Sequence, residues 1–277
     1  MNDLTEINID QLSYDAASRY FDPATFTTDP FVEVERTEWG ERAVFTPQGL
    51  PYIGSEMRFS AGGKTEEQVS DRFRIFIFRD GKATIYMTDE YGEMISKEMG
   101  GNLGYRIHKG QRFYIQAENA ARVIECTMAE AWTGEVHPTH FHYEEYVLRI
   151  GKPWGYELHF AKEDDPVMAK IHHINAGDRF SEHAHRVRRE SYWLLNGNCE
   201  LQMENSDRQL ISFPMENDKG YTVAVGQRHR HTGVLDCDVL EIGTPEGGKT
   251  WRIQDDYERP DQSDEQRRLE RAAAMME

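Results

Sequence analysis

The sequence contains little cysteine and no long apolar run. Its 277 residues include three cysteines, Cys126, Cys199 and Cys237, which are too few and odd in number for a disulfide framework. No stretch approaches the ~18 consecutive apolar residues that a membrane-spanning helix needs. The opening Met1-Asn2-Asp3-Leu4 does not begin a secretory signal peptide. We therefore expect a cytoplasmic protein with no membrane partner.

Basic residues are outnumbered by acidic ones. The chain has 32 Lys and Arg against 49 Asp and Glu, a formal charge of −17 with histidine neutral. Because binding to nucleic acid or to an anionic membrane needs a basic face, this balance excludes both partners. The apolar fraction of 38% is ordinary for a globular protein. The partner that we expect is a small molecule, a sugar or an anionic organic compound.

Helical periodicity is absent between about residues 31 and 253, where short runs with strand character alternate with Gly, Asp and Asn. The runs 74–78 and 83–87 flank Asp80-Gly81, and the runs 192–195 and 199–203 flank Asn196-Gly197. Such turn pairs between two strand-like runs predict β-hairpins. Many short strands of this kind favour an all-β barrel or sandwich.

Several landmarks recur at a fixed offset. Trp39-Gly40 returns as Trp154-Gly155, 115 residues later, and Gly81 returns as Gly197, 116 residues later. Gly110-Gln111-Arg112 matches 226–228, again at an offset of 116. A single one-residue slip aligns these matches in order, which predicts a tandem duplication of a unit somewhat over 100 residues long.

The second copy contains a set of side chains with the spacing of metal ligands. After Gly177 come His183, His185 and Glu190, and His229 follows three residues after Gly226. Because side chains two residues apart share one face of a strand, both early histidines would point into a small barrel. Three nitrogen donors and one oxygen donor suit one divalent transition metal: Zn, Fe, Mn or Ni.

The segment from Gly177 to Gly197 resembles the first motif of the cupin superfamily, and 226–229 resembles the core of the second. Ala224 and Gly233 depart from the second motif without changing a ligand. The resemblance implies an all-β fold of two tandem cupin (double-stranded β-helix, jelly-roll) barrels with short helical termini. In the first copy the ligand positions carry Glu67, Val69, Arg74 and Phe113, so we expect that barrel to be metal-free.

Five segments follow from these patterns. We expect an N-terminal lead-in with a short helix (1–30), a degenerate metal-free cupin (31–130), a His-rich linker (131–150), a metal-binding cupin (151–258) and a C-terminal helical tail (259–277). The linker contains His137, His140 and His142, whose spacing is weaker than that of a ligand set. We interpret the arginine-rich tail as a solvated terminal helix.

A narrower resemblance covers about 149–259. The segments 152–157, 226–230 and 251–259 resemble those of the cupin domain of type II phosphomannose isomerases and related small cupins. This resemblance implies a metal-dependent sugar or sugar-phosphate isomerase. Glu190 and His231 would be the catalytic residues, the latter because it shares the inward face of His229. Arginines near the ligands, Arg179, Arg186 and Arg230, would bind the substrate.

Other functions of the second barrel and the roles of several of its residues stay open. The same ligand set suits an Fe(II)-dependent oxygenase acting on a small organic substrate, or a non-catalytic bicupin that binds a metal or a sugar. One of His172 and His173 should point into the barrel, because neighbouring strand residues alternate faces. The aromatic residues Trp154, Tyr192 and Trp193 would stack on a sugar or fill the core. A bicupin needs a partner chain less, although a homodimer remains compatible.

Overall fold

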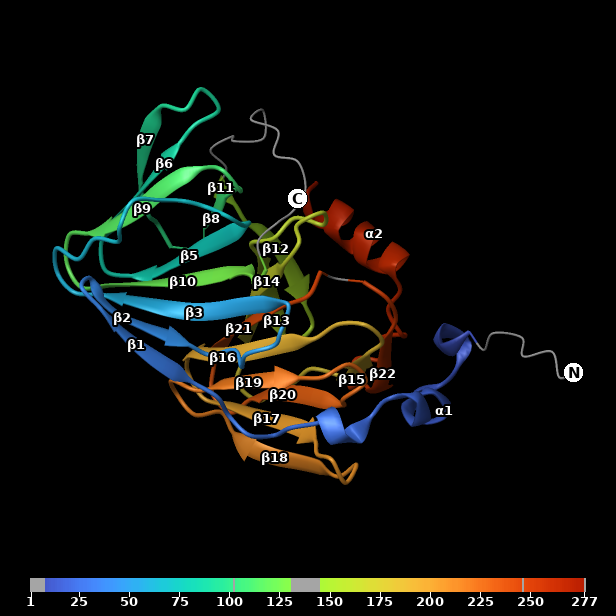
Figure 1. The fold of residues 1–277 in the computed structure, drawn as a ribbon. Helices are drawn as coiled ribbons and strands as arrows, with labels where there is room; N and C mark the ends of the chain where they lie inside the picture. Colours follow the sequence, from blue (N-terminus) through green and yellow to red (C-terminus); the bar gives the residue numbers. More distant parts are fainter. Residues whose placement is uncertain (1–7, 102, 131–144, 246, 277) are drawn as a thin grey trace, which may run out of the picture.

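The computed structural model describes residues 8–101, 103–130, 145–245 and 247–276, and it confirms the predicted all-β fold (Figure 1). In this part of the chain the strands form four sheets, in which every strand pair is antiparallel. A seven-stranded and a four-stranded sheet make the first barrel, and a six-stranded and a five-stranded sheet make the second.

The first barrel contains β1 (Glu33–Thr37), β2 (Gly40–Val44), β3 (Tyr52–Phe59), β4 (Gln68–Val69), β5 (Arg74–Asp80), β6 (Ala83–Thr88), β7 (Met94–Glu98), β8 (Gly104–Ile107), β9 (Arg112–Ala117) and β10 (Ala121–Met128). The short β11 (Glu145–Tyr146) pairs with β8.

The second barrel contains β12 (Leu148–Lys152), β13 (Gly155–His159), β14 (Met168–Ile174), β15 (Glu182–His185), β16 (Glu190–Asn196), β17 (Cys199–Glu204), β18 (Leu210–Pro214), β19 (Gly220–Val223), β20 (His229–Gly233), β21 (Cys237–Gly243) and β22 (Thr250–Gln254).

The two barrels repeat each other strand by strand, as the offsets predicted. The bounds of β5, β6, β7 and β8 reappear as those of β16, β17, β18 and β19, each 116 residues later. A Cβ atom on Gly81 would lie 2.1 Å from the carbonyl oxygen of Ala120, and one on Gly197 would lie 2.1 Å from that of Asp236. These close approaches are also 116 residues apart, so the tandem duplication is confirmed in the backbone.

The predicted hairpins are wrong, although their strands are right. β5 pairs with β10 and β8 in the seven-stranded sheet, whereas β6 pairs with β9 and β7 in the four-stranded sheet. β16 and β17 are divided between sheets in the same way. Gly81 and Gly197 do make tight turns with φ of 89° and 79°, but each turn carries the chain from one sheet of its barrel to the other. The turn residues determine the reversal, and burial of the inner faces determines the pairing.

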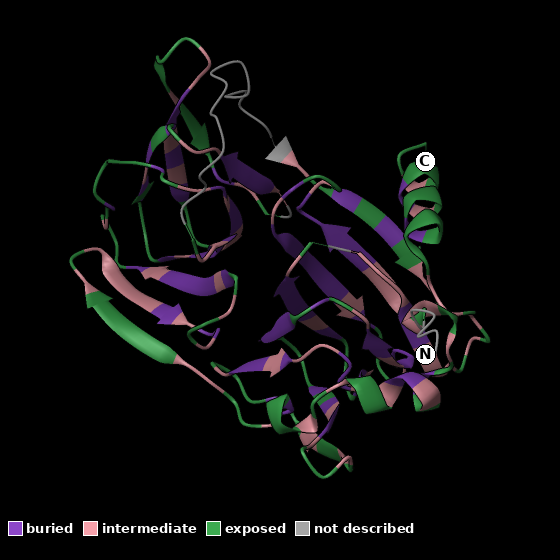
Figure 2. Ribbon diagram, turned by 45° about the vertical axis from the view of Figure 1, so that its right-hand side comes forward, coloured by how far each residue is buried: buried purple, intermediate pink, exposed green. Residues whose placement is uncertain are grey.

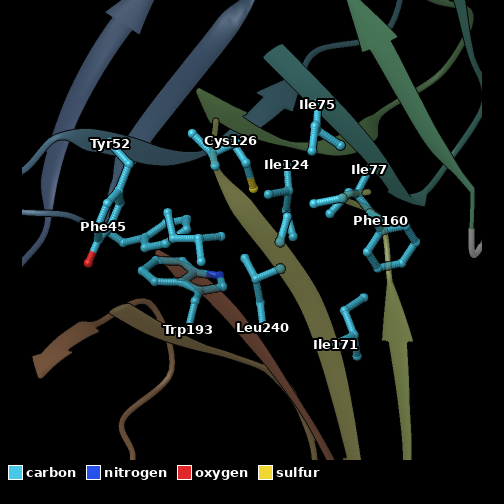
Figure 3. Close-up of a cluster of buried hydrophobic side chains, with 14 of the residues drawn as sticks. Phe45, Tyr52, Ile75, Ile77, Ile124, Cys126, Phe160, Ile171, Trp193 and Leu240 are labelled. Carbon is cyan, nitrogen blue, oxygen red and sulfur yellow. The ribbon is translucent and has the colours of Figure 1, made fainter. Parts of the chain in front are cut away.

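The barrels share a hydrophobic core in which the seven-stranded sheet packs on the six-stranded sheet (Figure 3). Phe45 from the first barrel stacks on Trp193 from the second, with ring centroids 4.8 Å apart and planes inclined by 27°. Beside this pair the hydroxyls of Tyr52 and Ser191 are hydrogen-bonded at 3.1 Å. Because Trp193 lies on β16, this interface also holds the strand that begins at Glu190.

The N-terminal lead-in belongs spatially to the second barrel. It contains the 3-10 turns η1 (Ile9–Gln11), η2 (Ser18–Tyr20) and η3 (Pro23–Thr25) in addition to the expected short helix, α1 (Tyr14–Ala17). Ser13, with an extended backbone, is the N-cap of α1, and its side chain accepts a hydrogen bond from the backbone N–H of Ala16. Trp251 on β22 donates its indole N–H to the carbonyl oxygen of Leu12 at 3.0 Å, and the Tyr14 hydroxyl donates to Glu204 at 3.0 Å.

The C-terminal tail forms the helix α2 (Asp264–Ala274), as expected. Ser263 and Gln266 form a capping box at its start. Arg267 and Arg271 are buried, whereas Leu269 is exposed, and Figure 2 shows buried and exposed residues alternating along the helix. Most of the helix is exposed, as expected for a solvated terminal helix, but Arg267 and Arg271 face the barrel. No helix of the described chain is long and apolar enough to cross a membrane.

Candidate metal centre

The structure brings the four predicted metal-ligating residues together inside the second barrel. His183 and His185 lie on β15, Glu190 begins β16, and His229 begins β20. His183 is paired directly opposite His229 across the two strands. One potential ligand atom from each residue lies within 4.8 Å of all the others. His185, Glu190 and His229 are buried, while His183 is half-buried.

Each imidazole is oriented through its Nδ1 atom. His183 Nδ1 lies 2.8 Å from the carbonyl oxygen of Ser181, His185 Nδ1 lies 3.0 Å from Thr250 Oγ1, and His229 Nδ1 lies 3.0 Å from the carbonyl oxygen of Gln227. If each Nδ1–H donates to its oxygen, each Nε2 carries the lone pair that a metal needs. The Nε2 atoms of His185 and His229 lie 3.1 Å and 3.4 Å from Glu190 Oε2.

Burial and neighbouring charges hold these groups in the protonation states of metal ligands. Burial lowers the pKa of His183 well below its ordinary value and lowers that of His185 to about 3, with His229 and Arg188 adding to the respective shifts. Burial alone would raise the pKa of the Glu190 carboxyl, but Arg188 and His185 outweigh it and hold that pKa well below its usual range. Neutral imidazoles and an ionised carboxylate fit a divalent metal.

Two further side chains reach the ligand atoms. The Tyr192 hydroxyl donates a 2.8 Å hydrogen bond to Glu190 Oε2 and lies 3.1 Å from His229 Nε2. An Nη atom of Arg188 lies 2.9 Å from His185 Nε2 and 3.1 Å from Glu190 Oε1. Sequence reasoning treated Tyr192 as a stacking or core residue, but its two-residue spacing from Glu190 on one strand was a usable signal.

A cationic cavity of about 70 Å³ opens beside the histidines, with room for roughly five water-sized groups. Seven Lys and Arg line it against three Glu, although the whole chain is acidic. The lining lysines are Lys152 and Lys170; the arginines are Arg188, Arg252, Arg259, Arg267 and Arg271; and the glutamates are Glu157, Glu241 and Glu270. The concentration of cations indicates a small anionic ligand.

A row of acidic and basic groups crosses the wall of this cavity. Glu157 and His159 on β13 face Lys170 and His172 on β14, and Glu241 on β21 lies opposite Lys170. His159 Nε2 donates to Glu157 at 2.8 Å, and His172 Nε2 donates to Glu241. Lys170 Nζ lies 3.2 Å from Glu241, and His172 Nδ1 lies 3.5 Å from Glu157. The row therefore joins two hydrogen-bonded acid–imidazole pairs, Glu157 with His159 and Glu241 with His172, that lie side by side.

Sequence analysis found one member of this row. His172 lines the cavity, whereas His173 points away and lies 2.8 Å from Asp238, so the expectation that one of the pair faces inward is confirmed. The remaining members carried a signal as well. Apart from His173, the rest of β14 is apolar, and Lys170 and His172, two residues apart, mark one face of the strand.

The arginines predicted to bind substrate lie elsewhere. Arg179 is paired with Asp256, Arg186 with Asp10, and Arg230 donates to the carbonyl oxygen of Gln254 at 3.2 Å. None of Arg179, Arg186 and Arg230 is among the residues that line the cavity. Their role stays a prediction, and the structure offers a different set of cations.

His231, the predicted base, is packed behind the cluster. Its ring lies 4.3 Å from that of Tyr192 and 5.3 Å from that of Phe180, and neither ring nitrogen has a hydrogen-bond partner. Burial lowers its pKa well below the ordinary value. His231 does not line the cavity, and its catalytic role also stays a prediction. The predicted linker histidines His137, His140 and His142 lie outside the described residues.

Different side chains occupy the corresponding positions of the first barrel. Arg74 stands where the second barrel has Glu190, and Phe113 stands where it has His229. Arg74 is paired with the buried Glu125, and Phe113 belongs to the core of the barrel. Among the residues that the structure describes, the cluster of candidate metal ligands therefore lies in the second barrel.

No protein-family model and no curated protein sequence matches this chain. Solved structures do match. The oxalate decarboxylase of Lactobacillus farciminis, in complex with formate, is 13% identical with a TM-score of 0.64, covering 83% of this chain and 89% of that one. An oxalate decarboxylase structure from a study of proton-coupled electron transfer is 13% identical with a TM-score of 0.65, covering 82% of this chain and 80% of that one.

A structure of Bacillus subtilis oxalate decarboxylase from a study of its Mn(II) centres is 12% identical with a TM-score of 0.62, covering 86% of this chain and 80% of that one. Identities this low show a common fold and leave the chemistry open. The likeness of the second barrel to phosphomannose isomerases stays a prediction from its motifs. Fold and geometry together show a bicupin architecture, two cupin barrels in tandem, with a candidate metal centre in the second barrel.

Proposed function

We propose that the protein is a metal-dependent isomerase of small phosphorylated sugars. The observation that carries the proposal is the row of acidic and basic groups that faces the candidate metal ligands inside a cationic cavity. An aldose–ketose isomerase must move a proton between two neighbouring carbons, and it needs no oxidant. Buried carboxylate and imidazole groups in hydrogen-bond contact are suited to that task.

The chain supplies distinct groups for binding and for proton transfer. A divalent metal held by the four ligands would polarise the substrate carbonyl and stabilise negative charge developing on its oxygen. Glu241 is our candidate base, because it lines the cavity and is hydrogen-bonded to His172, which can pass a proton on. Burial alone would raise the pKa of the Glu157 carboxyl, but Lys152 and Lys170 outweigh burial and hold that pKa well below its usual range.

The size of the site accommodates a substrate longer than the cavity itself. A neighbouring cavity of about 200 Å³ shares His159, Arg267 and Arg271 with the first. The sugar end would lie at the metal ligands, and the charged end would extend along these shared residues. The shared arginines supply positive charge for a phosphorylated end, while Glu163, Asp164, Asp165 and Asp264 also line the second cavity.

The test is isotope exchange by metal-loaded protein in D₂O with pentose and hexose phosphates, followed by NMR. We expect deuterium to enter at the carbon next to the carbonyl as aldose and ketose interconvert. Glu241→Gln should lower the exchange rate by roughly a hundredfold or more without changing the metal content. Glu200→Gln, an exposed change on β17, is the matched control.

Two results would reject the proposal: no exchange with any sugar or sugar phosphate by metal-saturated protein, or equal exchange by the Glu241→Gln and wild-type proteins. The first result would favour the non-catalytic binding alternative if a ligand still raised the melting temperature.

Oxygen-dependent or decarboxylating chemistry on a small organic acid is the second candidate. The small volume of the cavity beside the histidines and the likeness in fold to oxalate decarboxylases both favour it. Three nitrogens and one oxygen also suit Fe(II) or Mn(II). Release of CO₂ from oxalate, or consumption of O₂ with an organic acid, would support this candidate against the isomerase.

A further inference from the structure

Helix α2 packs on the second barrel with its polarity reversed. Arg267 and Arg271 lie one turn apart, and 7% and 8% of their surfaces are exposed. Leu269, between them in sequence, is 64% exposed. Figure 1 shows the helix beside β12, at the edge of the barrel that contains the candidate metal centre. A helix that only had to cover this edge would turn its leucine inward and its arginines outward.

This arrangement costs stability. Two like charges four residues apart on a helix destabilise it by a few tenths of a kcal/mol, roughly 0.2–0.5. Removing a guanidinium from water costs considerably more unless it is paired and hydrogen-bonded. The contacts of both guanidiniums offset part of this cost, and both side chains bring positive charge to the wall of the cavity.

Neighbouring atoms hold both guanidiniums at the cavity. Arg267 donates to the carbonyl oxygen of Gly248 and lies 3.4 Å from Thr250 Oγ1, the atom that orients His185. Arg271 donates to the carbonyl oxygen of Ala161 at 2.7 Å and to His159 Nδ1 at 3.0 Å. These contacts fix the positions of both guanidiniums at the wall of the cavity.

Other cations increase the positive potential around the helix. Lys152, Arg252 and Arg259 line the same cavity. Burial lowers the pKa of Arg252, and the charge of Arg259 lowers it further, so these cations repel each other at close range. Asp264, at the start of α2, is paired with Arg267 and offsets part of the charge.

We propose that Arg267 and Arg271 form the binding subsite for a phosphate monoester, so that the C-terminal helix recognises the phosphorylated end of the substrate. This inference rests on the proposed function and adds the group that confers specificity. A phosphate monoester carries about −1.5 to −2 charges at neutral pH, and two guanidinium forks can bind it in a bidentate manner. Both arginines line the two adjoining cavities, which places the phosphate between them.

Calorimetric titration of the metal-loaded protein with inorganic phosphate tests the subsite without turnover. We expect Arg267→Gln and Arg271→Gln each to weaken phosphate binding tenfold or more. The matched control is Arg122→Gln in the first barrel, because this side chain is 44% exposed, is paired with Asp80 and lines neither cavity; its affinity should equal that of the wild type. A parallel titration with acetate tests for a carboxylate instead, and we expect it to bind more weakly.

Lysine variants keep the test valid if a glutamine variant does not fold. Arg267→Lys and Arg271→Lys retain the charge and lose the planar fork, so each should fold and bind phosphate with reduced affinity. The proposal is overturned if wild-type protein does not bind phosphate, if both glutamine variants bind it like the control, or if acetate binds more tightly through the same arginines.

The outcomes separate this inference from the proposed function. Phosphate binding that depends on the two arginines would uphold the subsite even if no sugar phosphate underwent isotope exchange. Isotope exchange with wild-type affinity for phosphate in both glutamine variants would uphold the isomerase and remove the subsite.

Discussion

Thr250 offers a sharp test of the candidate metal centre, because it touches a ligand without being one. Its Oγ1 atom lies 3.0 Å from His185 Nδ1, and 4% of its surface is exposed. Thr250→Val replaces the hydroxyl by a methyl group of similar size. The Nδ1–H of His185 then has no acceptor at that position, and the nearby Arg188 cannot replace it because a guanidinium donates.

The size of the effect follows from two independent estimates. A buried donor left unsatisfied costs about 1–3 kcal/mol. Loss of a hydrogen bond that orients a metal-ligating histidine typically lowers metal affinity about 10–100-fold, equivalent to roughly 1.4–2.7 kcal/mol. The two ranges agree, so we expect Thr250→Val to weaken metal binding by one to two orders of magnitude while the fold is kept.

Competition with a chromophoric chelator measures this affinity for Mn(II) and Zn(II). Thr222→Val is the matched control, since Thr222 Oγ1 is bonded to Ser191 at 2.8 Å beside the interface between the barrels and touches no ligand. Equal affinities in the wild-type and Thr250→Val proteins would refute the orientation proposed for His185. An equal loss in both variants would show a general effect of the substitution.

The remaining predictions concern stability. Trp193→Ala should lower the free energy of unfolding by about 3–5 kcal/mol in urea titrations, because the indole is buried in the core between the barrels; a loss below about 1 kcal/mol would contradict a shared core. In metal-free protein, the pKa of His185 is about 3 when folded and 6.5 when unfolded, so the unfolded state binds more protons between these values. The free energy of unfolding of the metal-free protein should therefore fall as the pH falls from 6.5 towards 3. A urea midpoint that does not change with pH would disprove this. Gly197→Ala should destabilise more than Gly177→Ala in thermal melts: both have positive φ, but a Cβ at Gly197 would lie 2.1 Å from a carbonyl oxygen whereas one at Gly177 meets nothing within 4 Å. Equal losses would mean that the close approach has no cost.

The cluster of candidate metal ligands could be predicted because its information is local. The spacing of His183 and His185 on one strand reports a shared face, and the glycines around them report the turns. The duplication could be predicted for the same reason, because turn glycines such as Gly81 and Gly197 are required by nearby backbone atoms. Strand pairing is not local, and so the hairpins predicted at those glycines were wrong.

The cationic cavity could not be predicted because its residues come from distant segments. Glu157, Lys170 and Glu241 converge from three strands, and each by itself resembles an alternating polar residue of a strand. The tail is the clearest case. Its composition predicts a helix. The general preference of arginine for solvent does not predict that Arg267 and Arg271 are buried, because their burial depends on the barrel against which the helix packs.

Corresponding buried acids of the two barrels have different neighbours: Glu125 contacts two arginines, and Glu241 contacts Lys170 and His172. Glu125 and Glu241 occupy equivalent positions, 116 residues apart. In the first barrel Arg42 and Arg74 contact Glu125 and outweigh the effect of its burial, so that the pKa of its carboxyl stays below the usual value. The position of Arg74 is that of Glu190 in the second barrel, and a guanidinium there would repel a divalent cation that a carboxylate attracts. Together with Glu67, Val69 and Phe113 at the positions of the three histidines, this charge reversal separates a barrel whose buried acid is paired with its own arginines from one that presents a candidate metal site.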